Sequence, residues 1–461
     1  MDLLGVSTTA CLFGLVASGV VAGANASAGS TEVDRELEML RADLVQYRVD
    51  REAARIDSMR RMIVAEAIND MSSRLIPTVE DQTSGDAFPD AGWTGTFGWR
   101  SPDSNFSLSV SAQIKIRYVL NHRSGRRDLQ GNPSSVQRGF ENRRTRLVFS
   151  GGVFDSSWAY QIRGSFLRNS GDFALEDAWI RKSLGDGVSV MVGQFKPAFL
   201  REDIVSSRRQ LAIERSVVCD FFRQAWAQGI QATVLTDDVR VAGWFGDGIG
   251  PRSFGDARFN SVNTPWQRTA TSYSATGRVD WKLAGEWSQF DSFNSPRGSP
   301  RAVMLGTAIA TQQANFNLGP ADGTRISAVT ADATFCFSGA SVFISGVFAQ
   351  VVPRNEPRTL PWGVTAQAGV FVLDPLELYL RYEYMDADDP FRIDQETARF
   401  NGLTVGGTWF FAPEVKFSLD WVYNFASLAG DAFIANGAGF RADEQGETGQ
   451  WALRAQVQLV F

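Results

Sequence analysis

The side chains best suited to chemistry lie in residues 196–224, where basic and acidic groups alternate along one segment. Lysine and arginine attract anions, and an arginine guanidinium can hold a phosphate or a carboxylate through two parallel hydrogen bonds. We therefore interpret the segment as a loop that folds into the interior of the protein and binds or selects anions. The alternative is a solvated outer loop whose charges contact lipopolysaccharide or each other. Its bases are Lys196, Arg201, Arg208, Arg209, Arg215 and Arg223, and its acids are Glu202, Asp203, Glu214 and Asp220.

A second group of charges recurs at every other position of several segments, so that these charges would share one face of an extended strand. If that face lines a channel, its excess of bases favours anions over cations. The alternative is that these arginines pair with carboxylates and brace the wall. The bases are Lys115, Arg117, Arg144, Arg146, Arg163, Arg240, Arg278, Lys282, Arg381, Lys416 and Arg454, and the acids are Asp280, Glu377, Glu383 and Asp420.

Residue types needed for catalysis or metal binding are scarce. The chain has one histidine, His122, and three dispersed cysteines, Cys11, Cys219 and Cys336. A nucleophilic Ser or Cys needs a base beside it, and a structural zinc site needs four Cys or His ligands. We expect no catalytic residue, no metal site and no cofactor.

The charged positions belong to long segments in which apolar and polar residues alternate. In Phe106–Leu120 one face is apolar and the other is almost wholly polar. Fifteen residues exceed an average soluble strand, and a tilted strand needs roughly nine or more residues to cross a membrane. The polar face carries charges that a dry core would not tolerate, so the pattern predicts an antiparallel transmembrane β-barrel with a water-filled interior.

The connections between these segments give the number of strands. Eight longer polar stretches separate the short turns, so the pattern predicts sixteen strands in residues 106–461, with eighteen as the alternative. The count of sixteen treats Ala302–Thr311 as part of a folded loop. The short turns are Phe154–Ser157, Gly185–Gly187, Thr236–Asp238, Ala284–Glu286, Ser338–Ala340, Asp374-Pro375 and Ala412–Glu414.

The first 105 residues have a different composition. Residues 3–22 are uncharged and largely apolar and precede Ala24-Asn25-Ala26, which predicts a signal peptide over 1–26. An uncleaved anchor helix is the alternative. Residues 27–76 have coiled-coil spacing from Val33 to Met71, with a slip near 48–55, and predict a helix that self-associates or packs on the barrel. Residues 77–105 read as a linker.

Composition excludes other classes of protein. After residue 25 no apolar stretch approaches the roughly 20 residues of a membrane-spanning helix. The net charge is −6, with most of the acid excess before residue 106, so no basic surface for nucleic acid is expected. Arginine outnumbers lysine 40 to 5.

One stretch resembles a known family. Gly193-Gln194-Phe195-Lys196-Pro197-Ala198-Phe199, with Arg201-Glu202 and Glu214-Arg215-Ser216 after it, is similar to the signature of the phosphate-selective porin O/P family. Arg143-Arg144-Thr145-Arg146 and Glu176-Asp177-Ala178-Trp179 resemble its strand segments, and the terminal Phe461 fits an outer-membrane barrel. The resemblance implies a sixteen-stranded trimeric porin of the bacterial outer membrane with a periplasmic N-terminal extension. Lysine is scarce, so the family's lysine cluster is not placed residue by residue in this sequence.

Two functions are consistent with these patterns. The first is a porin for passive diffusion of small hydrophilic solutes, anion-preferring, with phosphate as one candidate. The second is a structural or adhesive barrel with a plugged lumen and a peptidoglycan-contacting rod. Expected partners are outer-membrane lipid, lipopolysaccharide and small anions, with no nucleic acid. The residues predicted to line the pore or its constriction are Lys196, Arg201, Glu202, Arg208, Arg209, Glu214, Arg215, Lys115, Arg117, Arg144, Arg146 and Arg163.

Overall fold

The structure is a computed structural model that describes nine stretches of the chain. The predicted signal peptide over 1–26, the predicted helix over 27–76 and most of the predicted linker lie outside them. The described residues are 97–123, 135–167, 170–248, 271–314, 323–354, 357–388, 399–426, 438–441 and 449–461.

Nearly all the regular structure in the described parts of the chain is antiparallel β-sheet. The first strands are β1 (Phe97–Arg100), β2 (Ser107–His122), β3 (Val136–Val153), β4 (Asp155–Phe166), β5 (Phe173–Gly185), β6 (Val188–Phe195), β7 (Ala227–Leu235) and β8 (Val239–Gly246). They are followed by β9 (Thr271–Ala284), β10 (Ala302–Ala314), β11 (Arg325–Phe337), β12 (Ala340–Val352), β13 (Trp362–Leu373), β14 (Leu376–Asp386), β15 (Arg399–Ala412), β16 (Val415–Asn424) and β17 (Trp451–Val460). The helical elements are α2 (Arg201–Ile204), α3 (Val217–Phe222) and the 3₁₀ turn η3 (Trp287–Asp291).

Strands β2 to β17 close into a barrel. Each pairs with its neighbours in the chain, and β17 pairs with β2, from Trp451 opposite His122 to Val460 opposite Gln113. This confirms the predicted sixteen-stranded antiparallel barrel. The short β1 lies inside the range predicted as a linker and pairs with β2 over Ser107–Val110, beyond the end of β17.

The exposed and buried sides of the strands reverse the arrangement of a water-soluble protein. In β13 the exposed positions include Val364 and Val370, whereas the buried ones include Thr365 and Gln367. Apolar side chains that face outward suit a hydrocarbon surround, and polar side chains that face inward suit a wet interior. No helix among the described residues is long and apolar enough to cross a membrane.

The segment around β10 corrects the sequence prediction. Ala302–Thr311 was expected in a folded loop, but it lies in β10 and pairs with both β9 and β11. Its inward positions, such as Gly306 and Ala308, are small rather than polar, so the usual alternation of polar and apolar residues is hidden. The longer connection instead precedes it, at residues 285–301, and includes η3. The turn predicted at Ala284–Glu286 is therefore not a tight hairpin, although the strand count stays at sixteen.

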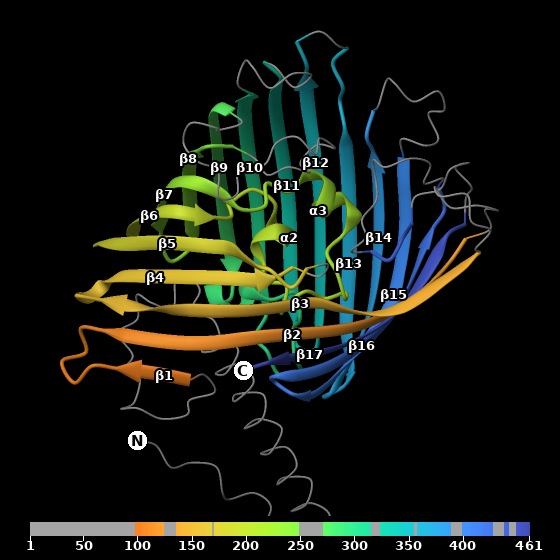
Figure 1. The fold of residues 1–461 in the computed structure, drawn as a ribbon, viewed down its shortest axis with the longest axis horizontal. Coiled ribbons are helices and arrows are strands. Elements are labelled where there is room, and N and C mark those ends of the chain that lie inside the picture. The colour runs from red at the N-terminus through yellow and green to blue at the C-terminus, as the bar shows by residue number, and fades with distance from the viewer. Residues whose placement is uncertain are drawn as a thin grey trace, which may run out of the picture. The chain divides into compact units, whose positions relative to one another are not determined.

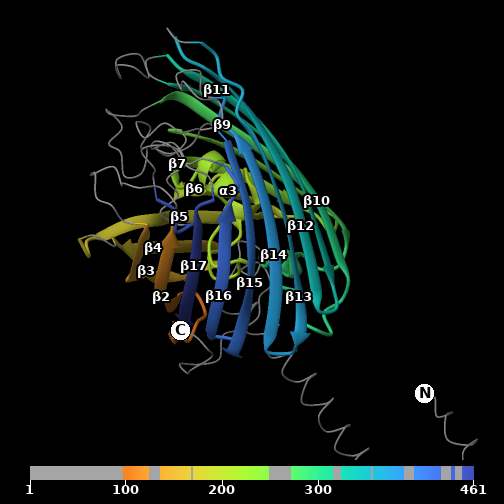
Figure 2. The same cartoon turned by 90° about the vertical axis from the view of Figure 1, so that its right-hand side faces the viewer.

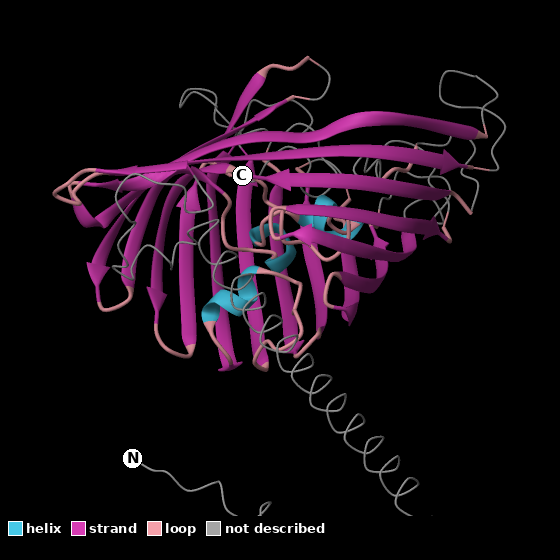
Figure 3. Cartoon of the chain, turned by 90° about the horizontal axis from the view of Figure 1, so that it is seen from below, coloured by secondary structure: helices cyan, strands magenta, loops and turns pink. Residues whose placement is uncertain are grey.

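The segment between β6 and β7 lies inside the barrel. Figure 1 shows β2–β7 running across the view and β9–β13 running upward, with α2 and α3 between the two groups. Figure 2, turned by 90°, shows α3 behind β16 and β17 and enclosed by the curved sheet. The view from below in Figure 3 shows strands around the helices. Residues 196–224 thus enter the interior, as the sequence predicted for the candidate site.

Candidate functional site

Apolar contacts hold one side of the inner segment against the wall. Phe199, Phe221 and Phe222 are buried in a cluster with small inward-facing residues of β10–β12, among them Ala308 and Ala349. The short helix α3 begins at Ser216, whose hydroxyl accepts a hydrogen bond from the backbone N–H of Cys219 at 2.8 Å. The small residues of these strands leave the volume that the three phenylalanines fill, which positions the segment next to the wall.

Glu214 binds the segment to the opposite wall. Its carboxylate accepts hydrogen bonds from Arg143 at 2.7 Å and from Arg144 at 2.9 Å, and Arg117 lies 3.5 Å away. The pKa of Glu214 is held well below its usual range because these guanidinium groups outweigh the effect of its burial. The side chain of Arg381 on β14 also donates to the backbone oxygen of Glu214 at 2.6 Å. Glu214 therefore docks the segment on the wall, and its carboxylate already has three arginine neighbours.

Further polar contacts tie the segment to other strands. Lys115 on β2 donates to the backbone oxygen of Ser207 at 2.7 Å, and Arg278 on β9 donates to that of Phe199 at 2.8 Å. The backbone N–H of Val217 donates to Glu383 on β14 at 2.5 Å. These contacts reach widely separated strands, so the segment spans the interior.

Internal contacts fix the shape of the segment around α2. Arg215 donates to the backbone oxygens of Glu202 at 2.9 Å and Val205 at 2.8 Å. The carboxylate of Glu202 accepts a hydrogen bond from the backbone N–H of Ser216 at 2.7 Å. Burial raises the pKa of Glu202 despite the neighbouring Arg381. Glu202 and Arg215 are thus structural parts of the loop.

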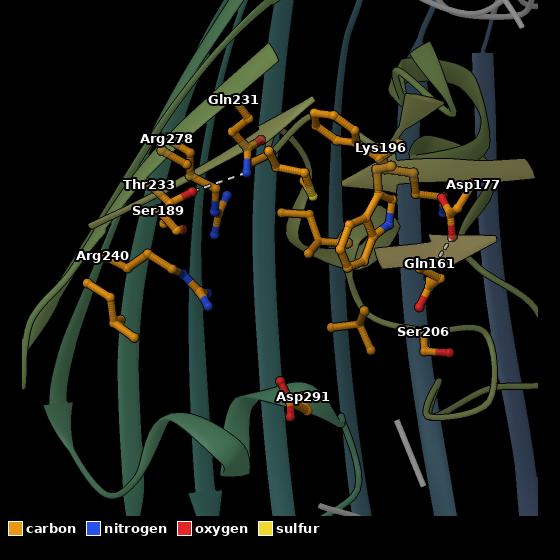
Figure 4. A pocket seen from close by; sticks show the side chains of 18 of the residues that line it. Gln161, Asp177, Ser189, Lys196, Ser206, Gln231, Thr233, Arg240, Arg278 and Asp291 are labelled. Carbon is orange, nitrogen blue, oxygen red and sulfur yellow. Dashed lines mark hydrogen bonds between the residues drawn. The ribbon is translucent and has the colours of Figure 1, made fainter. Parts of the chain in front are cut away.

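A cavity of about 540 Å³ lies between the inner segment and the wall formed by β3–β9. Figure 4 shows Arg240 and Arg278 on one side of it, and Lys196 and Asp177 on the other. Bases outnumber acids among its lining residues, which attracts anions. The bases are Arg146, Arg163, Lys196, Arg201, Arg208, Arg209, Arg215, Arg240 and Arg278, and the acids are Asp177, Asp186, Asp280 and Asp291.

Most cavity bases already have an acidic partner among the described residues. Lys196 contacts Asp203 at 2.6 Å, Arg209 contacts Asp291 at 3.2 Å, and Arg163 contacts Asp177 at 2.9 Å. Burial, followed by the charge of Arg215, lowers the pKa of Lys196 to about 7. The pKa of Asp203 falls to about 2, because Lys196 and Arg215 outweigh its burial.

Arg208 is different, because its charged neighbours are other arginines. Burial lowers its pKa to about 9, and Arg163, Arg146 and Arg209 add to that effect. Among the described residues, the only side chain that its guanidinium contacts by a hydrogen bond is Ser111, at 3.4 Å, and Nη1 has no partner. An anion would satisfy this donor and relieve the repulsion between like charges.

The wall charges are more often paired than the sequence indicated. Arg454 pairs with Asp420 at 2.6 Å, Arg381 with Glu383 at 2.7 Å, and Arg117 also contacts Glu141. The expected ratio of eleven bases to four acids is too high, because further acids face inward. Asp332 contacts Arg278 at 2.9 Å, and Glu176 contacts Arg146 at 2.7 Å.

Two inward residues that sequence reasoning missed lie at irregularities of the strand pairing. Lys115 pairs with Arg144 and the next residue, Ile116, with Asn142, so Arg143 is an extra residue. In the same way, Arg163 pairs with Asp177 and the next residue, Gly164, with Leu175, so Glu176 is an extra residue. A bulge redirects side chains, so strict alternation does not identify these two residues.

The twelve predicted site residues separate into two sets. Seven line the cavity: Lys196, Arg201, Arg208, Arg209, Arg215, Arg146 and Arg163. The other five are not among its lining residues: Glu202, Glu214, Lys115, Arg117 and Arg144. Arg117 and Arg144 contact Glu214, and Lys115 contacts the backbone of the segment at Ser207. The residues predicted to line a constriction thus divide between cavity-lining and docking positions.

Comparison with known proteins supports the same region. The family model described as "Phosphate-selective porin O and P" matches residues 119–249, the region whose motifs resemble that family. No curated protein sequence matches the chain. The fold is similar to an anion-selective porin from Comamonas acidovorans, with 12% identity and a TM-score of 0.53, over 77% of this chain and 100% of that chain.

Two other solved barrels show the same fold. The outer membrane channel DcaP of Acinetobacter baumannii is 10% identical with a TM-score of 0.52, over 79% of this chain and 99% of that chain. OmpF of Salmonella typhi, solved in complex with daunomycin, is 9% identical with a TM-score of 0.51, over 78% of this chain and 99% of that chain. Together, family and fold indicate a channel of the bacterial outer membrane rather than an enzyme.

Proposed function

We propose that this protein, whose residues 119–249 match the phosphate-selective porin O and P family, is an outer-membrane porin that lets small anions diffuse past the segment 196–224. The observation that carries the anion preference is Arg208, which lines the cavity among Arg146, Arg163 and Arg209. Its guanidinium has no carboxylate partner among the described residues. A mobile anion can take that place without displacing an acidic side chain of the protein.

The site supports phosphate and carboxylate alike as solutes. An arginine offers paired donors to either group. Only one lysine, Lys196, lines the cavity, and Asp203 already engages it at 2.6 Å. We therefore propose a general preference for anions rather than a site built for phosphate alone.

Ion selectivity in planar bilayers tests the proposal. With the purified full-length chain in a KCl gradient, we expect a reversal potential of the sign for Cl⁻ over K⁺. Preference for K⁺ would contradict it.

The dense contacts of the inner segment favour a second function, a structural or adhesive barrel with a plugged lumen. Glu214 alone contacts Arg117, Arg143 and Arg144. Such a barrel would give no single-channel steps over many insertions, whereas a porin gives discrete open steps.

We propose a homotrimer whose N-terminal helix over 27–76 lies in the periplasm after a signal peptide over 1–26 is removed. The coiled-coil spacing from Val33 to Met71 supports self-association. The outward apolar side chains of the barrel contact outer-membrane lipid, and the longer connections meet lipopolysaccharide.

A further inference from the structure

We propose that the cavity binds carboxylates that carry an apolar body, such as aromatic carboxylates, in preference to small inorganic or short-chain anions. This inference rests on the proposed function, because it assumes that anions enter the barrel. It names the class of solute that the lining of the cavity suits best.

Buried guanidinium groups without partners supply the charged half of the site. Arg201 lines the cavity and is only 4% exposed, yet its Nε and Nη2 have no hydrogen-bond partner among the described residues. Nη1 of Arg208 is likewise buried and has no hydrogen-bond partner among the described residues. A buried donor without an acceptor is costly, and a carboxylate has two oxygens with which to pair such donors.

Apolar side chains supply the other half. Trp179 on β5 and Met191 and Phe195 on β6 line the cavity and pack together on the inward face of the wall. On β10–β12, by contrast, the inward apolar residues are covered by Phe199, Phe221 and Phe222 of the inner segment. Met191 and Phe195 are buried within the β5–β6 cluster, whereas Trp179 is only partly buried. Trp226, which also lines the cavity, is partly buried as well. The body of a solute can therefore pack against these two indole rings.

An indole ring joins the two halves. Trp226 lines the cavity, with Nζ of Lys196 4.7 Å and Cζ of Arg146 5.6 Å from its ring centroid. Its Nε1 donates to Asp177 at 2.7 Å, which fixes the ring. Cationic and apolar groups therefore adjoin within one cavity. An inorganic anion would use only the cationic part of it.

Block of the Cl⁻ current by added carboxylates tests the inference. Acetate and benzoate carry the same charge at neutral pH and differ in their apolar body. We expect half-block by benzoate at a concentration about tenfold or more below that for acetate, because burial of several ring carbons adds to the shared ionic interaction. Cyclohexanecarboxylate should resemble benzoate if the apolar body, rather than the ring electrons, is recognised.

A pair of matched variants locates the effect. Met191→Gln keeps an unbranched side chain of similar length and places an amide on the apolar wall, so the difference between benzoate and acetate should shrink severalfold. Met304→Gln is the control, because Met304 is also buried on an inward strand position but does not line the cavity. Heat-modifiable mobility in gels establishes that both variants fold.

The outcomes separate this inference from the proposed function. A Cl⁻-selective channel that benzoate and acetate block at equal concentration overturns the inference and leaves the proposed function standing. A difference that survives in Met191→Gln, or that Met304→Gln removes equally, also overturns it. A K⁺-selective wild-type channel contradicts the proposed function directly.

Discussion

The arginines of the interior differ in what they contact, and this difference decides which of them can act on a solute. Arg454 is fully buried and holds Asp420 through two nitrogens, at 2.7 and 2.6 Å. Arg208 faces a serine and other arginines. A paired guanidinium presents little net charge to a passing ion, whereas an unpaired one retains its field.

We therefore expect Arg208→Gln to reduce selectivity more than any change on the outer rim. Removal of its charge should lower the permeability ratio of Cl⁻ to K⁺ by about twofold or more, since charges at a narrow point are poorly screened by salt. Reversal potentials in a KCl gradient measure it.

The matched control is Arg325→Gln, because Arg325 is exposed at the end of β11 and does not line the cavity. Equal effects of the two changes would show that the position of Arg208 is unimportant. Arg126 and Arg127, which the sequence places in a long polar connection, lie outside the described residues and are not used as controls.

We expect Lys196 to make the ion selectivity depend on pH. Its pKa is lowered to about 7, first by burial and then by Arg215, while Asp203 opposes the shift. The ammonium group is charged below that pH and neutral above it, so the preference for anions should fall as the pH rises from about 6 to 8.5. Lys196→Arg should remove this dependence, because a guanidinium stays charged throughout.

Reversal potentials across that pH range measure the effect. Lys182→Arg serves as the control, since Lys182 does not line the cavity, and it should keep the wild-type profile. A profile that Lys196→Arg leaves unchanged would assign the titration to another group.

At the scale of elements, docking of the inner segment depends on a few buried contacts. Glu214→Gln would leave Arg117, Arg143 and Arg144 facing one another in a buried position. Removing one partner of a buried ion pair costs about 3–5 kcal/mol. We expect a lower unfolding temperature in heat-modifiability gels and a noisier open channel.

Asp374→Asn provides the comparison for Glu214. Asp374 contacts Arg297 at 3.8 Å, and both side chains are nearly half exposed. A surface pair of this kind contributes roughly 0–1 kcal/mol, so the variant should melt close to the wild type. If both variants melt alike, Glu214 does not hold the segment.

The strands also show where sequence reasoning works and where it stops. Alternation identifies strands such as β13 and β14 because their inward and outward residues differ in polarity. It fails at β10, where the inner segment covers the inward face and small residues replace polar ones. The inner segment and β10 are far apart in the sequence. A local pattern of residues therefore cannot predict that one covers the other.

The same limit of sequence reasoning applies to individual residues of the site. The charged composition of 196–224 predicts its importance, but the bulge at Arg143 and the one at Glu176 reverse the local alternation. Whether an arginine meets an acid across the barrel, as Arg278 meets Asp332 at 2.9 Å, depends on strand register. The net charge of the cavity lining therefore could not be obtained from strand parity alone.

At the scale of the whole molecule, the closed sheet and the inner segment have different roles. Closure pairs the backbone groups of β2–β17 with neighbours, which a lipid surround demands. The backbone hydrogen bonds therefore hold the wall together. The charged side chains of the wall, most of which are paired, are not needed for its closure. The segment 196–224 narrows the interior and supplies the unpaired guanidinium groups of Arg201 and Arg208.

Assembly is a separate property that we propose for the predicted helix over residues 27–76. The heptad-like stripe from Val33 to Met71 needs a partner to be buried, and one helix supplies none. Because the barrel closes through its own backbone hydrogen bonds, deletion of residues 32–76 should leave a folded, heat-modifiable barrel that forms conducting channels. Light scattering in mild detergent should give a trimer mass for the full-length chain and a shift toward monomer for the deletion at low concentration. A monomeric full-length chain under these conditions would contradict the proposed trimer. A deletion variant that stays fully trimeric would show that the barrel wall, rather than residues 32–76, mediates association.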